Sequence, residues 1–183
     1  RPHELQLGFL KFLPGAPIKE IIDDYGYKYQ STPPYEFISN NDLSASQLNY
    51  LKKFEEVFDI FYNSKRFCFT VQRLLKKLPA VNIFNSLLAH MESNNLFNQP
   101  HSLNAQYKII HDTFTLSKDP AALDILRLDY LYAQRVYRLP RFLEVDGARQ
   151  KTWPGDKKTP LVPFLHTIQI EKGDAEIKTT SSP

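Results

Sequence analysis

Residues 44–61 read Ser-Ala-Ser-Gln-Leu-Asn-Tyr-Leu-Lys-Lys-Phe-Glu-Glu-Val-Phe-Asp-Ile-Phe and have the pattern of an amphipathic helix. Ser44 and Gln47 form a capping box, in which each side chain satisfies a backbone N–H group at the start of a helix. Apolar residues then recur at spacings of three and four, which places them on one helical face. The stretch therefore predicts a long helix that buries the face made by Leu48, Leu51, Phe54, Phe58 and Phe61.

Four further segments have the same helical character. Ser102 is placed to cap one of them, and Asp119 with Pro120 at the first helical position opens another. The connections are short, so neighbouring helices should pack as antiparallel pairs. We therefore predict a mainly α fold, a bundle of about five helices within residues 43–143, with the four further helices at about 67–78, 81–94, 103–114 and 119–131.

The N-terminal residues do not fit this helical pattern. Residues 4–13, Glu-Leu-Gln-Leu-Gly-Phe-Leu-Lys-Phe-Leu, alternate at first and then place apolar residues on both faces. Such a run is typical of a strand buried on both sides in a parallel sheet or barrel. No matching strand follows until the far C-terminus, so we expect residues 1–15 to be an orphan strand whose partners have been removed. It should pair weakly, or with a strand near 162–170.

The remaining segments are short. Pro17 to Tyr25 is a helix candidate that Gly26 stops. Residues 27–42 and 144–160 contain turn-forming residues and are expected to be loops, and a short C-terminal β-hairpin is expected from about 162 to 178. The predicted organisation is therefore a barrel remnant with a linker, a helical domain and a loop-rich tail, at 1–42, 43–143 and 144–183.

Composition excludes several classes of protein. The 183 residues are 42% hydrophobic and 23% charged, which is ordinary globular usage and argues against disorder throughout. The single cysteine, Cys68, excludes a disulfide framework within the chain and an iron–sulfur cluster held by several of its thiolates. A net charge of +3 is too small to indicate nucleic-acid binding by itself.

The chain carries no visible targeting signal. No apolar run approaches the roughly 18 residues of a membrane helix, and no signal-peptide pattern is present. With one unpaired thiol, this predicts a cytoplasmic protein without a membrane partner. The chain begins at Arg1 without Met, and we expect it to be a piece of a longer polypeptide.

The chemistry-bearing residues do not form a recognisable catalytic pattern. Cys68 lies between Phe67 and Phe69, which favours a buried, inert thiol. The aromatic series from Phe54 to Phe69 could stack on a flat ligand, but its helical spacing favours core. The carboxylates Glu55, Glu56, Asp59, Asp124 and Asp129 are interpreted as solvated faces, and the histidines as exposed or capping, because no two lie at ligand spacing; these are His3, His90, His101, His111 and His166. No catalytic residue and no metal site are predicted.

Residues 133–158 are rich in basic side chains with aromatic residues between them. This pattern suits the phosphate backbone of a nucleic acid, and a docking surface for another domain explains it equally well. Nucleic-acid binding is therefore kept as an alternative function, carried by Arg135, Arg138, Arg141, Lys151, Lys157 and Trp153.

Three stretches together resemble a known family. They are Glu4-Leu-Gln-Leu-Gly-Phe-Leu-Lys-Phe-Leu-Pro-Gly-Ala-Pro17, then Tyr25-Gly26 with Pro33-Pro34-Tyr35-Glu36, and Leu126-Arg-Leu-Asp-Tyr-Leu131 with Arg138-Leu-Pro140. They are similar to the C-terminal part of bacterial radical S-adenosylmethionine proteins, Fe–S oxidoreductase-like enzymes that carry an N-terminal cobalamin-binding domain. The resemblance covers most of residues 1–143 and fades in the tail.

The resemblance implies a parent enzyme with a [4Fe–4S] cluster, S-adenosylmethionine and cobalamin. The family's three-cysteine motif is absent here, so this chain is expected to bind none of these cofactors and to be a non-catalytic accessory domain. It would cover or dock on the barrel, its partner being the N-terminal domains of its own chain, and help to shape substrate access. The parent's substrate is not implied.

The same resemblance places one segment near the parent's active site. The stretch around Leu7 would be the last strand of the barrel, and barrel active sites lie at the C-terminal ends of strands. The residues there would line the cavity, with Lys11 meeting a carboxylate or phosphate and Gly15 allowing close backbone approach. The alternative is that Pro14-Gly15 is only a turn and Lys11 only a solvated edge. The candidate residues are Lys11, Phe12, Leu13, Pro14 and Gly15.

Overall fold

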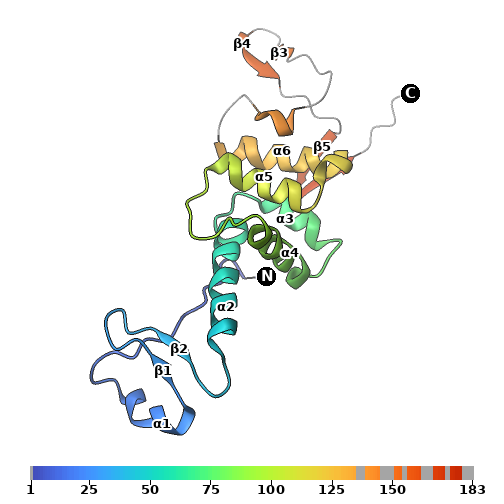
Figure 1. The fold of residues 1–183 in the computed structure, drawn as a ribbon. Helices are drawn as coiled ribbons and strands as arrows, with labels where there is room; N and C mark the ends of the chain where they lie inside the picture. Colours follow the sequence, from blue (N-terminus) through green and yellow to red (C-terminus); the bar gives the residue numbers. More distant parts are fainter. Residues whose placement is uncertain are drawn as a thin grey trace. The chain divides into compact units, whose positions relative to one another are not determined.

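The computed structural model describes residues 2–134, 139–144, 151–153, 156–161, 167–171 and 174–178, the last four ranges and residue 134 by their backbone alone. The chain forms two compact units, Arg1–Phe58 and Asp59–Pro183, which are described separately. Helices dominate the described residues, so the mainly α prediction is confirmed (Figure 1). The first unit ends at Phe58, whereas the sequence suggested that the helical domain begins at residue 43.

The first unit contains short elements and one long helix. These are the 3-10 helix η1 (Pro17–Ile21), α1 (Ile22–Tyr25), β1 (Lys28–Tyr29), β2 (Phe37–Ser39) and α2 (Ala45–Phe58). The capping box before α2 is formed as predicted. The backbone N–H of Gln47 donates to Ser44 Oγ at 3.3 Å, and the N–H of Ser44 donates to Gln47 Oε1 at 2.9 Å. Local sequence therefore fixes where α2 begins.

Gly26 stops α1 as expected. Its φ is +63°, in the left-handed region that side chains disfavour. A Cβ on this residue would also displace the side chain of Asn41. The backbone conformation therefore favours glycine at the turn from α1 into β1.

The prediction of a loop over residues 27–42 is wrong in part, because β1 and β2 lie within it. They pair antiparallel, with Lys28 opposite Ser39 and Tyr29 opposite Phe37. Strands this short have no readable alternation. Contacts between aromatic rings from distant positions stabilise them instead: the ring of Phe12 stacks on Tyr29 at 4.6 Å between centroids.

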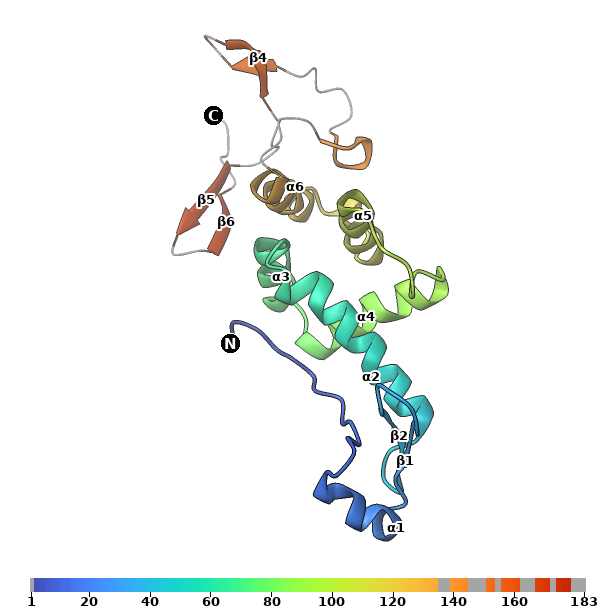
Figure 2. The same ribbon diagram turned by 90° about the vertical axis from the view of Figure 1, so that its left-hand side faces the viewer.

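The N-terminal segment is extended, and its residues 10–12 pair with residues 35–37. Lys11 forms an isolated antiparallel bridge with Glu36, the N–H of Phe12 donates to the carbonyl of Tyr35 at 2.8 Å, and the N–H of Phe37 donates to the carbonyl of Leu10 at 2.9 Å. Figure 2 shows the chain before this point as an extended trace. The N-terminal segment was expected to pair weakly or with a strand near 162–170, and the short ladder with residues 35–37 is the weak pairing. Within the described residues, the C-terminal strands pair with each other.

The second unit holds the remaining helices. They are the π-helical turn η2 (Asp59–Asn63), α3 (Cys68–Leu75), α4 (Ala80–Ser93), α5 (Leu103–Thr113), η3 (Leu116–Lys118), α6 (Pro120–Gln134) and η4 (Arg141–Leu143). α3 packs against α6, and α4 against α5. Both predicted N-caps are formed, since Ser102 Oγ accepts from the N–H of Ala105 and Asp119 Oδ1 from the N–H of Ala122. The fully buried core side chains include Ile83, Leu87, Met91, Tyr107, Ile110, Ile125 and Leu126.

Two hairpins follow the helices in the second unit. β5 (Thr167–Glu171) pairs with β6 (Asp174–Lys178), which confirms the predicted C-terminal hairpin. β3 (Lys151–Trp153) pairs with β4 (Asp156–Leu161), so the prediction of a loop over 144–160 is wrong there. Pro160 was one of the turn-forming residues that favoured a loop. Proline is nevertheless tolerated in an edge strand, and both strands of a two-stranded ladder are edge strands.

Candidate functional site

The predicted cavity-lining segment of residues 11–15 divides into one buried and several exposed residues. Phe12 is fully buried and belongs to the core of the first unit with Phe37 and Leu48. Leu13 is 53% exposed, and Lys11 and Pro14 are exposed as well. Phe12 therefore anchors the segment, while its neighbours project their side chains away from this core.

Gly15 has a conformational role in this chain. Its φ is +77°, and the N–H of Ala16 closes the turn on the carbonyl of Leu13 at 3.1 Å. A Cβ at this position would have no atom within 4 Å. The turn requires glycine for its backbone conformation, and nothing in the first unit approaches it closely.

Lys11 lies near a charged pair within the first unit. Its bridge partner Glu36 forms an ion pair with Lys52, with 2.6 Å between Lys52 Nζ and Glu36 Oε2. The hydrogen bond from Lys52 and its charge hold the pKa of Glu36 below its usual value, and the charge of Lys11 adds a smaller effect. Lys11 is therefore near one carboxylate of this chain while its side chain stays exposed, so it can also meet an anion from outside.

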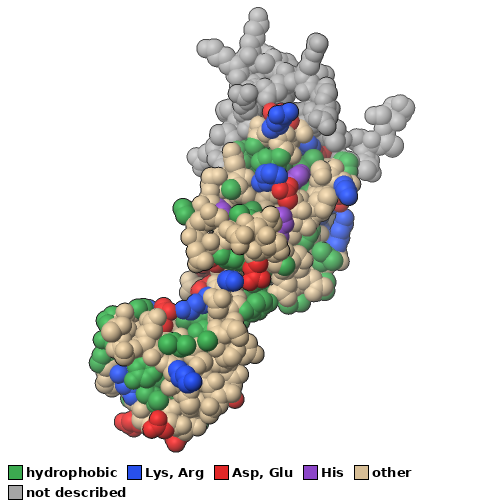
Figure 3. Space-filling view, in the orientation of Figure 1, with side chains coloured by type: hydrophobic (Ala, Val, Ile, Leu, Met, Phe, Trp, Pro, Cys, Tyr) green, Lys and Arg blue, Asp and Glu red, His purple; other side chains and the backbone are tan. Residues whose placement is uncertain are grey.

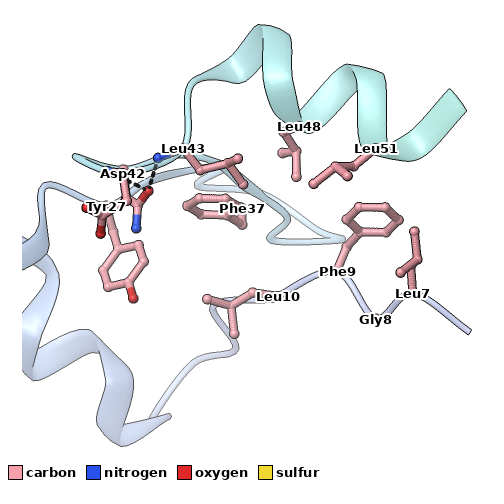
Figure 4. A pocket seen from close by; sticks show the side chains of 11 residues that line it. Leu7, Gly8, Phe9, Leu10, Tyr27, Phe37, Asp42, Leu43, Leu48 and Leu51 are labelled. Atoms are coloured by element: carbon pink, nitrogen blue, oxygen red, sulfur yellow. Dashed lines mark hydrogen bonds between the residues drawn. The ribbon is translucent and has the colours of Figure 1, made fainter. Parts of the chain in front are cut away.

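An apolar pocket of about 350 Å³ adjoins this segment. Residues 7–10 of the extended segment form one wall, Leu48 and Leu51 of α2 form the other, and Phe37 of β2 lies between them (Figure 4). The volume and apolar lining are those of a small ligand or side-chain pocket. Sequence reasoning missed this pocket, although the apolar alternation of residues 5–9 was its signal.

The polar groups of the pocket gather at one end. Asn40 Oδ1 accepts hydrogen bonds from the backbone N–H groups of Asp42, at 3.2 Å, and Leu43, at 2.7 Å. This turn leads directly into α2 and places Asp42 on the pocket lining. The site can hold apolar groups, but it brings together no acid, base and nucleophile, so binding is the chemistry that it supports.

The basic residues of the alternative function lie largely outside the described residues. Arg141, in η4, is exposed, while Arg135 and Arg138 fall outside the described part of the chain. Lys151, Trp153 and Lys157 lie on β3 and β4, whose backbone alone is described. Nucleic-acid binding by this segment stays a prediction.

The remaining candidate groups are structural where the structure describes them. Cys68 was expected to be buried and is instead half-buried; burial still raises the pKa of its thiol, and the charge of Asp129 adds to the rise. His111 was expected to be exposed or capping and is instead buried, with Nδ1 2.7 Å from Asp112 Oδ1. Among the described residues, no group of three histidine, cysteine or acidic side chains could hold a metal ion. The one cysteine of the chain also does not fit a cluster held by three thiolates.

The carboxylates of α6 overturn the solvated-face interpretation. Asp124 and Asp129 are both buried. Asp124 pairs with the buried Arg127 at 2.6 Å, and Arg127 Nε donates to the carbonyl of Leu143 at 2.6 Å. Tyr130 donates its hydroxyl proton to Asn104 Oδ1 at 2.8 Å. The polar residues of the Leu126–Leu131 stretch thus hold neighbouring segments onto α6.

Asp129 caps another helix. Its two oxygens accept from the N–H groups of Phe69, at 3.1 Å, and Thr70, at 2.7 Å, in the first turn of α3. A second pocket, of about 530 Å³, lies beside this contact and includes Cys68 and Tyr132 in its lining. The signal for these buried acids was their position, with Arg127, in a run whose other residues from Ala121 to Leu131 are apolar or aromatic.

The comparisons with known proteins give one family. Residues 23–158, about three-quarters of the chain, match a family described as "Protein of unknown function (DUF4080)". No curated protein and no solved structure matches the chain. No helix in the described part of the chain is both long and apolar enough to cross a membrane.

Proposed function

This chain belongs to the DUF4080 family of proteins of unknown function, and we propose that it is a non-catalytic accessory domain of a cobalamin-dependent radical S-adenosylmethionine oxidoreductase. In this proposal the first unit docks on the catalytic barrel of that enzyme and helps to shape access of its substrate. The cluster, S-adenosylmethionine and cobalamin are bound by other parts of the enzyme. The sequence resemblance of residues 4–17 suggests the class of enzyme.

The extended N-terminal segment carries the proposal. Leu5 and Leu10 are each 38% exposed and Leu13 is 53% exposed, although all three lie in a run with the pattern of a buried strand. The ladder with residues 35–37 accounts for only the end of this run. Exposed apolar surface on an extended chain favours pairing with a further strand, which would bury it. A sheet or barrel edge is the partner that suits this geometry.

The exposed end of the same segment supports a role near substrate. Phe12 fixes the chain by its ring contacts, so Lys11 and Leu13 hold defined positions on either side of it. Once residues 4–10 are paired, these side chains would lie at the end of the added strand, where barrel enzymes place their active sites. Hydrophobic side chains are spread over the visible surface of this unit (Figure 3).

Hydrogen exchange tests the docking. We expect amides of residues 4–10 to exchange at least about tenfold more slowly in the complete product of the open reading frame than in this chain alone, because strand pairing protects them. Amides of α2 serve as the internal control and should exchange equally in both. Equal exchange of residues 4–10 in the two proteins would refute the docking.

Activity assays test the second half of the proposal. In the complete protein, Lys11→Ala and Leu13→Ala should fold, since both side chains are exposed. We expect weaker substrate binding or slower S-adenosylmethionine cleavage than wild type. A matched control is Lys19→Ala, a charge removal in η1 of the same unit. If both test variants behave as wild type, the segment is scaffold.

A further inference from the structure

The second unit contains a buried carboxylate with an unusual set of partners. Asp129 is 3% exposed, and its two oxygens accept hydrogen bonds from the backbone N–H groups of Phe69 and Thr70. Within the described residues no cation forms an ion pair with it. Buried carboxylates usually have such a partner, because an ionised group away from water is costly. The hydroxyl of Thr70, also buried, lies beside the carboxylate.

The groups that face Asp129 do not compensate its charge. Arg66 is occupied by Gln106 Oε1 at 2.9 Å, and Lys65 lies over the ring of Tyr62 at 4.9 Å. Cys68 and Tyr107 are the other titratable neighbours whose side chains the structure describes. Burial raises the pKa of both, and the charge of Asp129 raises it further, so both stay neutral near physiological pH.

Burial and nearby donors act on the pKa of Asp129 in opposite directions. Burial raises this pKa to about 7, while the hydroxyl and N–H of Thr70 and the N–H of Phe69 oppose the rise. These donors prevent a larger shift, because they stabilise the carboxylate. The acid then changes charge in the physiological range, at the N-terminus of α3.

We infer that the contact between α3 and α6 is a pH-sensitive joint, which is tight when Asp129 is protonated and opens more readily when Asp129 is ionised. Opening admits water to the carboxylate and releases the first turn of α3. The joint lies beside the 530 Å³ pocket, whose lining includes Cys68 and Asp129. The shape of that pocket would thus vary with pH.

Proton linkage gives the direction in which the stability of the closed contact changes with pH. In the opened state Asp129 has an ordinary pKa of about 4, so the closed state binds more protons between about pH 4 and pH 7. Closure is therefore fully stabilised at low pH, weakens about tenfold per pH unit through this window, and levels off above pH 7. A capping carboxylate of the usual kind, with a lowered pKa, would show the opposite trend.

Hydrogen exchange of the full chain between pH 5 and 8.5, corrected for intrinsic exchange, tests the joint. Protection of the first amides of α3 should fall about tenfold from pH 5.5 to 7, whereas amides of α4 should show no comparable step. Asp129→Asn should abolish the step. Asp119→Asn is the matched control: it removes another capping carboxylate, whose pKa is lowered by the N–H of Ala122 and by Lys77, and should leave the step unchanged.

Two results would overturn the inference. One is protection of α3 that stays constant from pH 5 to 8.5 in the folded wild type. The other is an Asp129→Asn variant that keeps the wild-type step. If Asp129→Asn does not fold, the carboxyl carbon of Asp129 can be titrated by ¹³C NMR in the wild type; a midpoint below about 5 would contradict the joint, and one near 7 would support it.

Discussion

Replacing Arg127 with Met should destabilise the second unit by about 3–5 kcal/mol. Arg127 and Asp124 are 1% and 0% exposed, and the 2.6 Å pair between them is supplemented by hydrogen bonds from the guanidinium to the carbonyls of Leu143 and Glu144. Methionine keeps much of the aliphatic volume but removes the charge that pairs with Asp124 and the donors that the two carbonyls use. Breaking a buried pair from one side typically costs that much, which is a large part of the 5–15 kcal/mol stability of an ordinary domain.

A second variant separates the charge from the packing. Arg127→Met with Asp124→Leu removes both charges, and we expect it to regain at least about half of the loss, because a buried pair can often be exchanged for apolar residues at little cost. The carbonyls of Leu143 and Glu144 still lose their donor, so recovery should be incomplete. Urea unfolding followed by far-UV circular dichroism measures both variants. This account would be refuted if Arg127→Met lowered the free energy of unfolding by less than about 1 kcal/mol. It would also be refuted if the double variant were no more stable than Arg127→Met alone.

Three further changes test other features. Gly26→Ala should destabilise the first unit by at least about 1 kcal/mol, because its φ of +63° is strained for any residue with a Cβ and the Asn41 side chain must move; Gly8→Ala, where a Cβ has open space, is the control in urea unfolding. Ser102→Ala should cost about 1 kcal/mol through the lost cap of α5, and Ser102→Asp should restore it; no loss on Ser102→Ala would show that the cap contributes nothing. If the basic segment binds nucleic acid, Arg141→Glu should weaken RNA binding and reduce its salt dependence. Filter binding that is unchanged by this substitution would count against the alternative function.

The helices were predictable from sequence because their signals are local. Ser44 with Gln47, Ser102, and Asp119 with Pro120 each satisfy or replace backbone donors within one turn, and all three helix starts are found where the sequence placed them. The stop at Gly26 depends only on a backbone conformation. Such features need no knowledge of the distant chain.

The features that sequence reasoning missed depend on distant contacts. β1 and β2 are too short to show alternation, and the ring of Phe12, from a segment interpreted separately, packs against both. Asp129 was interpreted as solvated because its partner, the start of α3, lies 60 residues away, and Asp124 because its partner Arg127 is itself held by the carbonyl of Leu143, 16 residues further along. A charged residue within an apolar run is the one hint that sequence offers.

The capping of α3 by Asp129 also sets an order of assembly. α3 has eight residues and no side-chain cap of its own at Phe67, and a helix this short is not stable alone in water. The carboxylate that satisfies its first N–H groups is 60 residues further along the chain. During synthesis α3 therefore leaves the ribosome well before its cap exists, and its start is fixed only after α6 has been made. We expect α3 to be the last of these helices to gain protection from hydrogen exchange during folding, although it is the first of the second unit's α-helices to be translated.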